Sequence, residues 1–360
     1  MKTPLCAVLS CGMDERFLDH VAPFSQLMGF PLYLSDEQNQ ELASKYYPLT
    51  KVVFCPQSEM SADLFDEYDL LFQSTFWRPD EKFFFSMKRK KKLLFAYLPH
   101  GNSDKGHRAP MMDLVELQDF VLIYGKQMVE RLQKIGVWKD VRHWAFLGNY
   151  REMFYRQHQD FYNAIVQKEI FSSLDRKKMT CLYAPTWQDP EHSSSFFSVT
   201  KDLIEQLPQD FNLLIKPHPL LEENSPALYH AMLGLCERKN NIKVIEKMPL
   251  IYPLLSFCDL YLGDFSSIGY DFTTFQRPMF FFPSKKKQKD DPAHLLRGSG
   301  LVLPERTKIF SFIEKNLFAF DGKMKEKQKA MAQFAFGEKK SLAQIREEIH
   351  EKILELWNGV

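Results

Sequence analysis

Histidine, lysine and serine side chains follow several apolar runs of this sequence, where each run ends. His100 follows "KLLFAYLP", Lys216 and His218 follow "FNLLI", and Ser266 and Ser267 follow "DLYLGDF". A neutral imidazole accepts a proton near pH 7, whereas ammonium groups and hydroxyls stabilise anionic oxygen. These residue types therefore indicate proton transfer combined with phosphate binding.

Two prolines bracket His218 in "LLIKPHPLL" (213–221). Proline fixes its own φ and restricts the residue before it, so the two rings hold Lys216 and His218 in one direction. The alternative is a stiff strand-to-helix turn with His218 bonded to backbone. Gly101 lets the chain turn sharply after His100, which leaves this histidine at a strand tip, either as a general base or as a surface residue.

Hydroxyl groups stand at two further strand ends. Thr186 in "LYAPTWQD" (182–189) is a donor to a phosphate, unless the Pro-Thr-Trp segment is only a rigid turn. Ser266 and Ser267 stand where a helix is expected to begin, and the first amides of a helix lack intrahelical acceptors. The alternative there is plain N-capping by Asp264 or Ser266.

The apolar runs that precede these residues are typical of strands buried on both faces, and the spacers between them fit crossover helices. The expected strands are 5–11, 51–55, 68–73, 92–98, 120–125, 180–184, 211–216, 242–246, 259–264 and 278–282. The sequence predicts an α/β fold with two Rossmann-like domains. Ligands bind beyond the carboxyl ends of parallel strands, where the polar residues above are found.

The 360 residues suffice for two domains of ordinary size. We place an N-terminal domain at 1–150, a C-terminal domain at 151–323 and C-terminal helices at 324–360. A long helical stretch is expected at 151–178. In the C-terminal segment, apolar residues recur at helical intervals: Leu342, Ile345, Ile349, Ile353 and Leu356.

Composition excludes several classes of protein. A net charge of +1 gives no general reason to expect nucleic acid. The six cysteines form no Cys-x-x-Cys pair and indicate buried thiols in a reducing compartment rather than disulfides or zinc. No run approaches 18 apolar residues, so we expect no membrane span and a cytoplasmic protein. Two lysine runs, 88–92 and 285–289, are either solvated loops or contacts to an anionic membrane surface.

In four places together the sequence resembles the CDP-glycerol glycerophosphotransferase family, whose members include teichoic acid polymerases. The family shows an Asp-Tyr-Ser-Ser block followed by Asp, a basic residue and Pro, and three shorter motifs containing Pro-Thr-Trp, His-Pro and His-Gly followed by Lys. The matching residues here are Asp264, Ser266, Ser267, Asp271, Arg277 and Pro278, then Tyr183, Pro185, Thr186 and Trp187, then Lys216, His218 and Pro219, then His100, Gly101 and Lys105. The first 90 residues carry none of these motifs.

The resemblance implies a GT-B architecture, in which two Rossmann-like domains face each other across a cleft. It also implies transfer of glycerol phosphate, or a related alditol phosphate, from CDP-glycerol to a hydroxyl of a lipid-linked or glycan acceptor, with release of CMP. His100 would be the base and His218 a second catalytic residue. The donor would be held by Lys105, Thr186, Lys216, Asp264, Ser266, Ser267 and Asp271, without cofactor or tightly bound metal.

Three alternatives share parts of this site. A GT-B glycosyltransferase with a nucleotide-sugar donor and a nucleotide-sugar epimerase would bind a diphosphate in the same way. A non-catalytic nucleotide-binding module would keep the fold without turnover. By analogy with the family, the acceptor would bring the protein to the inner face of the cell membrane as a peripheral protein.

Overall fold

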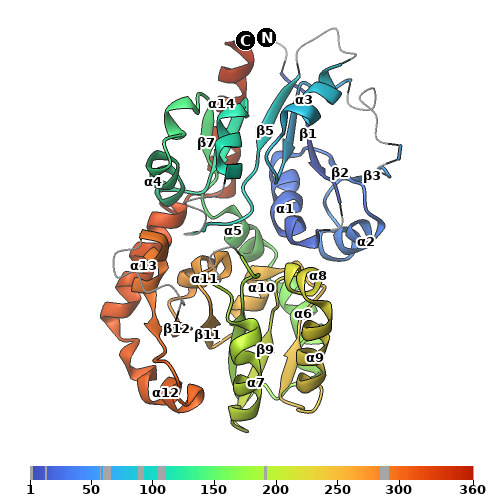
Figure 1. Cartoon of the computed structure of the whole chain (residues 1–360). Helices are drawn as coiled ribbons and strands as arrows, with labels where there is room; N and C mark the ends of the chain where they lie inside the picture. The colour runs from blue at the N-terminus through green and yellow to red at the C-terminus, as the bar shows by residue number, and fades with distance from the viewer. Residues whose placement is uncertain are drawn as a thin grey trace.

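The structure is a computed structural model of the chain, and it describes residues 3–12, 14–56, 58–59, 66–87, 93–103, 110–189, 193–283 and 292–359. The two lysine runs and Lys105 lie outside these ranges. Figure 1 shows an upper body formed by the N-terminal half of the chain and a lower body formed by the C-terminal half. The C-terminal helix packs on the upper body.

The first sheet is parallel in every described pairing, and its strand order is β3-β2-β1-β4-β5-β6-β7. Its strands are β1 (Cys6–Ser10), β2 (Leu32–Leu34), β3 (Val52–Phe54), β4 (Leu70–Gln73), β5 (Leu94–Tyr97), β6 (Phe120–Ile123) and β7 (Trp144–Phe146). The order reverses between β1 and β4, so the carboxyl ends of these two strands border the crevice where such sheets bind ligands.

The second sheet is also parallel throughout its described pairings, in the order β10-β9-β8-β11-β12-β13. Its strands are β8 (Met179–Ala184), β9 (Phe211–Ile215), β10 (Ile242–Val244), β11 (Leu260–Gly263), β12 (Met279–Phe281) and β13 (Leu301–Val302). β8 and β11 are its central neighbours. The predicted α/β fold with two parallel sheets is confirmed, and each predicted strand is present.

Three short strands were not predicted: β2, β7 and β13. Each has only two or three residues. The predicted helical stretch at 151–178 is interrupted. It forms α5 (Tyr150–Gln157), α6 (Gln159–Glu169) and a short 3-10 turn, Phe171–Ser173. His158 separates the two helices with a non-helical backbone (φ −116°, ψ 27°).

The remaining helices connect and cover the strands. In the first half they are α1 (Leu18–Met28), α2 (Glu37–Tyr46), α3 (Pro79–Ser86) and α4 (Lys126–Lys134). In the second half they are α7 (Phe196–Gln206), α8 (Leu220–Asn224), α9 (Pro226–Cys236), α10 (Ile251–Ser256), α11 (Ser267–Phe272) and α12 (Ile309–Asn316). The chain ends with α13 (Gly322–Phe336) and α14 (Leu342–Asn358).

The C-terminal helices connect the two bodies. α13 contacts α4 of the first half and α11 of the second, and α14 contacts β7, α5 and α1. Ile345, Ile349, Ile353 and Leu356 of α14 are buried, as their spacing predicts. Ser341 begins α14 with a capping box, in which its hydroxyl accepts from the Gln344 amide. The division of the chain at 150 and 323 remains a prediction.

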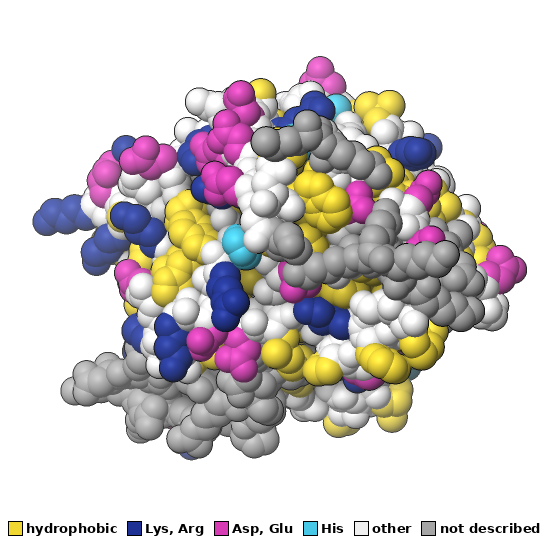
Figure 2. Space-filling view, turned by 90° about the horizontal axis from the view of Figure 1, so that it is seen from above, with side chains coloured by type: hydrophobic (Ala, Val, Ile, Leu, Met, Phe, Trp, Pro, Cys, Tyr) yellow, Lys and Arg dark blue, Asp and Glu magenta, His cyan; other side chains and the backbone are white. Residues whose placement is uncertain are grey.

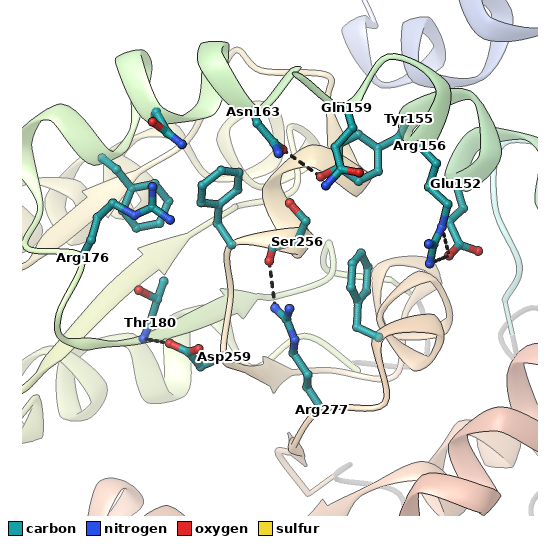
Figure 3. A pocket seen from close by; sticks show the side chains of 14 residues that line it. Glu152, Tyr155, Arg156, Gln159, Asn163, Arg176, Thr180, Ser256, Asp259 and Arg277 are labelled. Atoms are coloured by element: carbon teal, nitrogen blue, oxygen red, sulfur yellow. Dashed lines mark hydrogen bonds and ion pairs between the residues drawn. The ribbon is translucent and has the colours of Figure 1, made fainter. Parts of the chain in front are cut away.

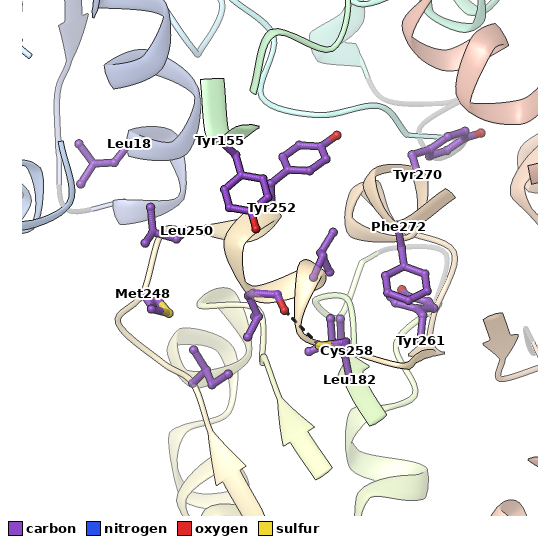
Figure 4. Close-up of a cluster of buried hydrophobic side chains, with 14 of the residues drawn as sticks. Leu18, Tyr155, Leu182, Met248, Leu250, Tyr252, Cys258, Tyr261, Tyr270 and Phe272 are labelled. Carbon is purple, nitrogen blue, oxygen red and sulfur yellow. Dashed lines mark hydrogen bonds between the residues drawn. The ribbon is translucent and has the colours of Figure 1, made fainter. Parts of the chain in front are cut away.

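One hydrophobic core runs through both halves. Leu18 of α1 and Leu250, beside α10, belong to the same cluster of buried side chains as Leu182 of β8. Figure 4 shows Leu18 and Leu250 facing the same interior region from the two halves. Removing this apolar surface from water stabilises the halves against each other as well as internally.

A candidate active site between the two sheets

A cavity of about 250 Å³ lies between the two halves and collects the predicted site residues. The predicted residues among its lining are His100, Thr186, Lys216, His218, Ser266, Ser267 and Asp271. They come from the loops after β5, β8 and β9 and from the segment after β11 that includes α11, at the carboxyl ends of both sheets. Two halves that contribute opposite walls of one cavity allow a base from one domain to meet a phosphate held by the other.

His100 has a defined protonation pattern. Its Nδ1 lies 2.6 Å from the Ser74 carbonyl oxygen, which can only accept a hydrogen bond. Nδ1 therefore carries the proton, and Nε2 of the neutral ring keeps its lone pair. The side chain remains exposed to solvent, while the protein around it lowers the pKa of His100 below its usual value by desolvation. The ring is consequently available as a proton acceptor at neutral pH.

The His100 loop is held from two sides. Gly101 has φ 129°, and a Cβ added there would lie 2.7 Å from the Cβ of Ser267 in the other half. Glycine is thus required both by the backbone conformation and by the close approach. On the other side, Tyr124 donates to the Pro99 carbonyl (3.1 Å) and lies 2.7 Å from His20 Nδ1.

His218 contacts a donor at each ring nitrogen. The backbone amide of Leu220 donates to its Nδ1 over 3.2 Å, so the predicted backbone bond of His218 is present. Its Nε2 contacts the guanidinium of Arg16, which comes from the first half and also pairs with Asp14. An imidazole from the second half and a guanidinium from the first half therefore meet at one point of the cavity.

Lys216 lies in the same wall and is 7% exposed. Its Nζ donates to the Glu246 carbonyl over 3.1 Å, which fixes the direction of the side chain. Burial lowers the pKa of Lys216 to about 8, partly offset by the nearby carboxylate of Glu15. The ammonium group therefore loses its charge at a lower pH than an exposed lysine would.

The start of α11 differs from the predicted arrangement. α11 has only six residues, and Ser266 at its N-cap makes no side-chain capping bond. The capping alternative for Ser266 and Asp264 is therefore wrong. The helix is also too short for a substantial dipole, so the hydroxyls of Ser266 and Ser267, rather than the helix, are the useful donors.

Asp264 does not line the cavity, although its residue type and position suggested that it would. Its carboxylate accepts from the backbone amides of Thr186 (2.9 Å) and Ser195 (3.1 Å). Asp264 is therefore better described as a positioning residue for the loop after β8. Lys105, another predicted donor-binding residue, lies beyond the described ranges.

Asp271 lines the cavity, but its carboxylate is engaged in an ion-pair network. Arg151 of α5 donates to Asp271 Oδ2 (2.5 Å) and to Asp19 Oδ2 of α1 (2.6 Å). Tyr252 donates to Asp271 Oδ1 over 3.0 Å. Burial raises the pKa of both carboxyls, and the single guanidinium only partly offsets this. The network links the two halves directly beneath the site.

Sequence reasoning missed four lining residues with titratable side chains: Glu15, Arg16, His20 and Arg151. Glu15, Arg16 and His20 follow β1, the first apolar run of the chain. The rule that located the other candidates, polar residues after a buried strand, applies to this position as well. Arg151 has no comparable signal, because it lies on a helix and its role depends on carboxylates from two distant segments.

A second, more polar cavity of about 490 Å³ lies elsewhere, beside α5, α6 and α10. Figure 3 shows its side chains bonded mainly to one another and to backbone. Arg277 donates to the carbonyl oxygens of Ser256 (2.9 Å) and Cys258 (2.5 Å), and Arg156 pairs with Glu152. None of the seven predicted residues named above lines this cavity. Arg277 therefore stabilises the turn before β11 rather than a phosphate.

Two parallel sheets with a cavity between the carboxyl ends of their strands define a protein of the GT-B type. Comparison with solved structures agrees. The structure of the wall teichoic acid polymerase TagF, soaked with CDPG, matches with a TM-score of 0.66 and 15% identity over 99% of this chain and 90% of that one. A complex of MnaA from S. aureus with UDP matches with a TM-score of 0.63 and 12% identity over 98% of this chain and 97% of that one.

Residues 154–291 match the family of CDP-glycerol:poly(glycerophosphate) glycerophosphotransferases. The teichoic acid glycerol-phosphate primase of Bacillus subtilis is 27% identical over 142 residues, which are 39% of this chain and 35% of that protein. The chain thus aligns with about a third of the length of this curated relative. The resemblance predicted from the sequence is confirmed by these matches.

Proposed function

We propose that the protein transfers glycerol phosphate from CDP-glycerol to an acceptor hydroxyl and releases CMP. The observation that carries this proposal is that His100 of the first half and His218 of the second half line one cavity. His100 presents the lone pair of Nε2, and His218 lies against the guanidinium of Arg16. The family match over residues 154–291 supports CDP-glycerol as the donor.

In this reaction the acceptor oxygen attacks the phosphorus that carries glycerol, and the bond from that phosphorus to the oxygen of CMP breaks. His100 Nε2 takes the proton of the acceptor hydroxyl. Phosphoryl transfer needs charge stabilisation more than covalent help. His218 Nε2–H, Lys216 and Arg16 supply it around the diphosphate, and the hydroxyls of Ser266 and Ser267 add further donors.

We give Arg16 a role in this proposal because the residue after Pro-Thr-Trp in the loop after β8 is glutamine here, whereas the family that the sequence resembles often has arginine there. Gln188 stands after Pro-Thr-Trp, and its side chain is exposed. Arg16 reaches the cavity from the first half and contacts His218. A diphosphate oxygen placed between Arg16 and His218 would accept from the guanidinium and from an imidazole protonated on Nε2.

The proposal is tested by CMP release from CDP-glycerol and by donor binding, measured on the same variants. His100→Ala is expected to lower turnover by about 10²–10⁴-fold with nearly unchanged donor affinity, as for loss of a general base. His230→Ala is the matched control, because His230 lies on α9 with a side chain 61% exposed. Near-normal turnover of His100→Ala would remove the base from the mechanism.

The same experiment separates the alternatives. Binding of UDP-glucose without binding of CDP-glycerol would favour a nucleotide-sugar enzyme. Binding of CDP-glycerol without CMP release in the presence of acceptors would favour a non-catalytic module.

The acceptor we propose is lipid-linked or a glycan, reached through a peripheral membrane contact. Among the described residues no helix is long and apolar enough to cross a membrane. Phe83 and Met87, at and just after α3, are 67% and 57% exposed. Figure 2 shows hydrophobic side chains among charges of both signs on the face seen from above, the side on which α3 lies in Figure 1. Sedimentation with anionic vesicles tests this contact, and Phe83→Ser should weaken it.

A further inference from the structure

A separate cavity of about 320 Å³ opens in the first half at the carboxyl ends of β1 and β4. Its lining consists of Leu9, Ser10, Cys11, Phe17, Gln73, Ser74, Thr75, Trp77, Glu81, Phe84 and Phe85. These two strands are direct neighbours, with Leu9 paired to Gln73. The cavity therefore occupies the point at which the strand order reverses, where open α/β sheets bind ligands.

Two residues that line this cavity also contact the proposed base, His100. The Phe17 ring packs edge-on against the His100 ring, with 4.9 Å between centroids. The Ser74 carbonyl accepts the hydrogen bond from His100 Nδ1. Both residues also line the cavity. A molecule bound here lies next to the imidazole that would take a proton from it.

Three polar side chains in the wall of this cavity have no hydrogen-bond partner in the structure. They are the Ser10 hydroxyl, the Gln73 amide nitrogen and the Ser74 hydroxyl, and each residue is at most 6% exposed. Buried polar groups are nearly always hydrogen-bonded, and leaving one unpaired is unfavourable. Three such groups on two adjacent strand ends indicate that a polar ligand completes the site.

The other walls indicate what kind of ligand this is. Phe17, Trp77, Phe84 and Phe85 provide aromatic surface. Glu81 contributes a carboxylate, and within the eleven lining residues there is neither lysine nor arginine. Arg78, whose Nε lies 4.0 Å from Glu81 Oε2, is not among the lining residues. A carboxylate in a wall that itself carries no cation disfavours a phosphate group. Aromatic faces combined with hydroxyl, amide and carboxylate groups suit a neutral ring that has both C–H faces and hydroxyls.

We propose that this cavity binds a neutral sugar unit of the acceptor and directs one of its hydroxyls toward His100. This inference rests on the proposed function for the role of the sugar as acceptor, but the binding of a neutral sugar can be measured without any turnover. If the cavity binds such a sugar, the protein should add the first glycerol phosphate unit to a sugar hydroxyl rather than to the end of a glycerol phosphate chain.

The test measures binding of two soluble probes, methyl β-D-glucoside and sn-glycerol 3-phosphate, by ligand-observed NMR. We expect the wild-type protein to bind the glucoside more tightly. Gln73→Leu keeps the size of the side chain but removes the amide, and should weaken glucoside binding at least tenfold. Because it removes an unpaired buried group, its melting temperature should be unchanged or higher. Ser10→Ala should weaken glucoside binding in the same direction, which covers the case of a Gln73 variant that fails to fold.

Glu81→Gln provides a test of charge, with Glu41→Gln on the exposed side of α2 as control. Only the Glu81 variant should bind sn-glycerol 3-phosphate more tightly than wild type. Unchanged glucoside binding by Gln73→Leu and Ser10→Ala, or tighter wild-type binding of glycerol phosphate than of glucoside, would overturn the inference. CDP-glycerol binding, measured in parallel, should be the same in these variants. Its absence in wild type would count against the proposed function and not against the sugar site.

Discussion

Gly101 of the first half touches Ser267 of the second so closely that no side chain fits between them. A Cβ at residue 101 would lie 2.7 Å from Ser267 Cβ and 3.2 Å from its hydroxyl oxygen. The loop that carries the proposed base therefore rests directly on the start of α11. The distance between base and donor site is fixed by backbone contact and not only by flexible side chains.

Gly101→Ala is expected to lower both stability and turnover. The strain at φ 129° alone should reduce the free energy of unfolding by about 1–3 kcal/mol, and the clash with Ser267 should displace His100. Urea unfolding and CMP release measure the two effects. Gly234→Ala on α9 is the control, because a Cβ there meets nothing within 4 Å. A Gly101 variant as stable and active as this control would contradict the close approach.

The Arg151 network should control stability through buried charge. Arg151→Met leaves Asp19 and Asp271 buried without their cation, and we expect a loss of about 3–5 kcal/mol in the free energy of unfolding. Asp19→Asn leaves one guanidinium with one carboxylate and should cost much less. Denaturant unfolding of both variants at pH 7 is the measurement, and equal losses would contradict this account.

The same network makes a prediction about pH. Burial raises the pKa of Asp19 from 3.8 to about 6, so the folded protein holds this proton more tightly than the unfolded chain does. The contribution to stability is therefore complete below about pH 4 and is lost as pH rises to about 6. The difference in unfolding free energy between wild type and Asp19→Asn should follow this slope. A difference that does not vary with pH would contradict it.

The pH dependence of kcat/KM for CDP-glycerol should show two limits. On the acid side activity falls when His100 gains a proton, at a pKa below 6.5 because desolvation lowers it. On the alkaline side activity falls near pH 8, where Lys216 loses its charge. Lys216→Arg should move only the alkaline limit upward, since arginine remains charged. If the alkaline pKa of the kcat/KM profile is unchanged in this variant, a group other than Lys216 causes the loss of activity at high pH.

Much of the site could be predicted because the fold follows a simple rule. Runs rich in Val, Ile, Leu and Phe identified ten strands, and polar residues after them identified His100, Thr186, Lys216, His218, Ser266 and Ser267. The strands β2, β7 and β13 were not identified in this way. Asp264 was misplaced because sequence spacing does not show which way a side chain points at a strand end.

What the sequence could not show depends on contacts between distant segments. Arg151 meets Asp19 and Asp271 across 132 and 120 residues, and no local pattern encodes this. The unpaired Gln73 and Ser10 lie on separate runs and read as ordinary strand residues until the sheet brings them together. Arg16 was overlooked because the first 90 residues lack the family motifs.

The position of α14 has a consequence for the order in which the protein folds during synthesis. This helix, the last of the described chain, packs on β7, α5 and α1, and buries Ile345, Ile349, Ile353 and Leu356 there. A ribosome delivers the N-terminal half first, but the apolar surface that α14 covers stays exposed until residues 342–358 have emerged. The N-terminal half is therefore synthesised first but can finish folding only after α14 has been made. Until then its uncovered apolar surface is exposed to aggregation or to chaperone binding.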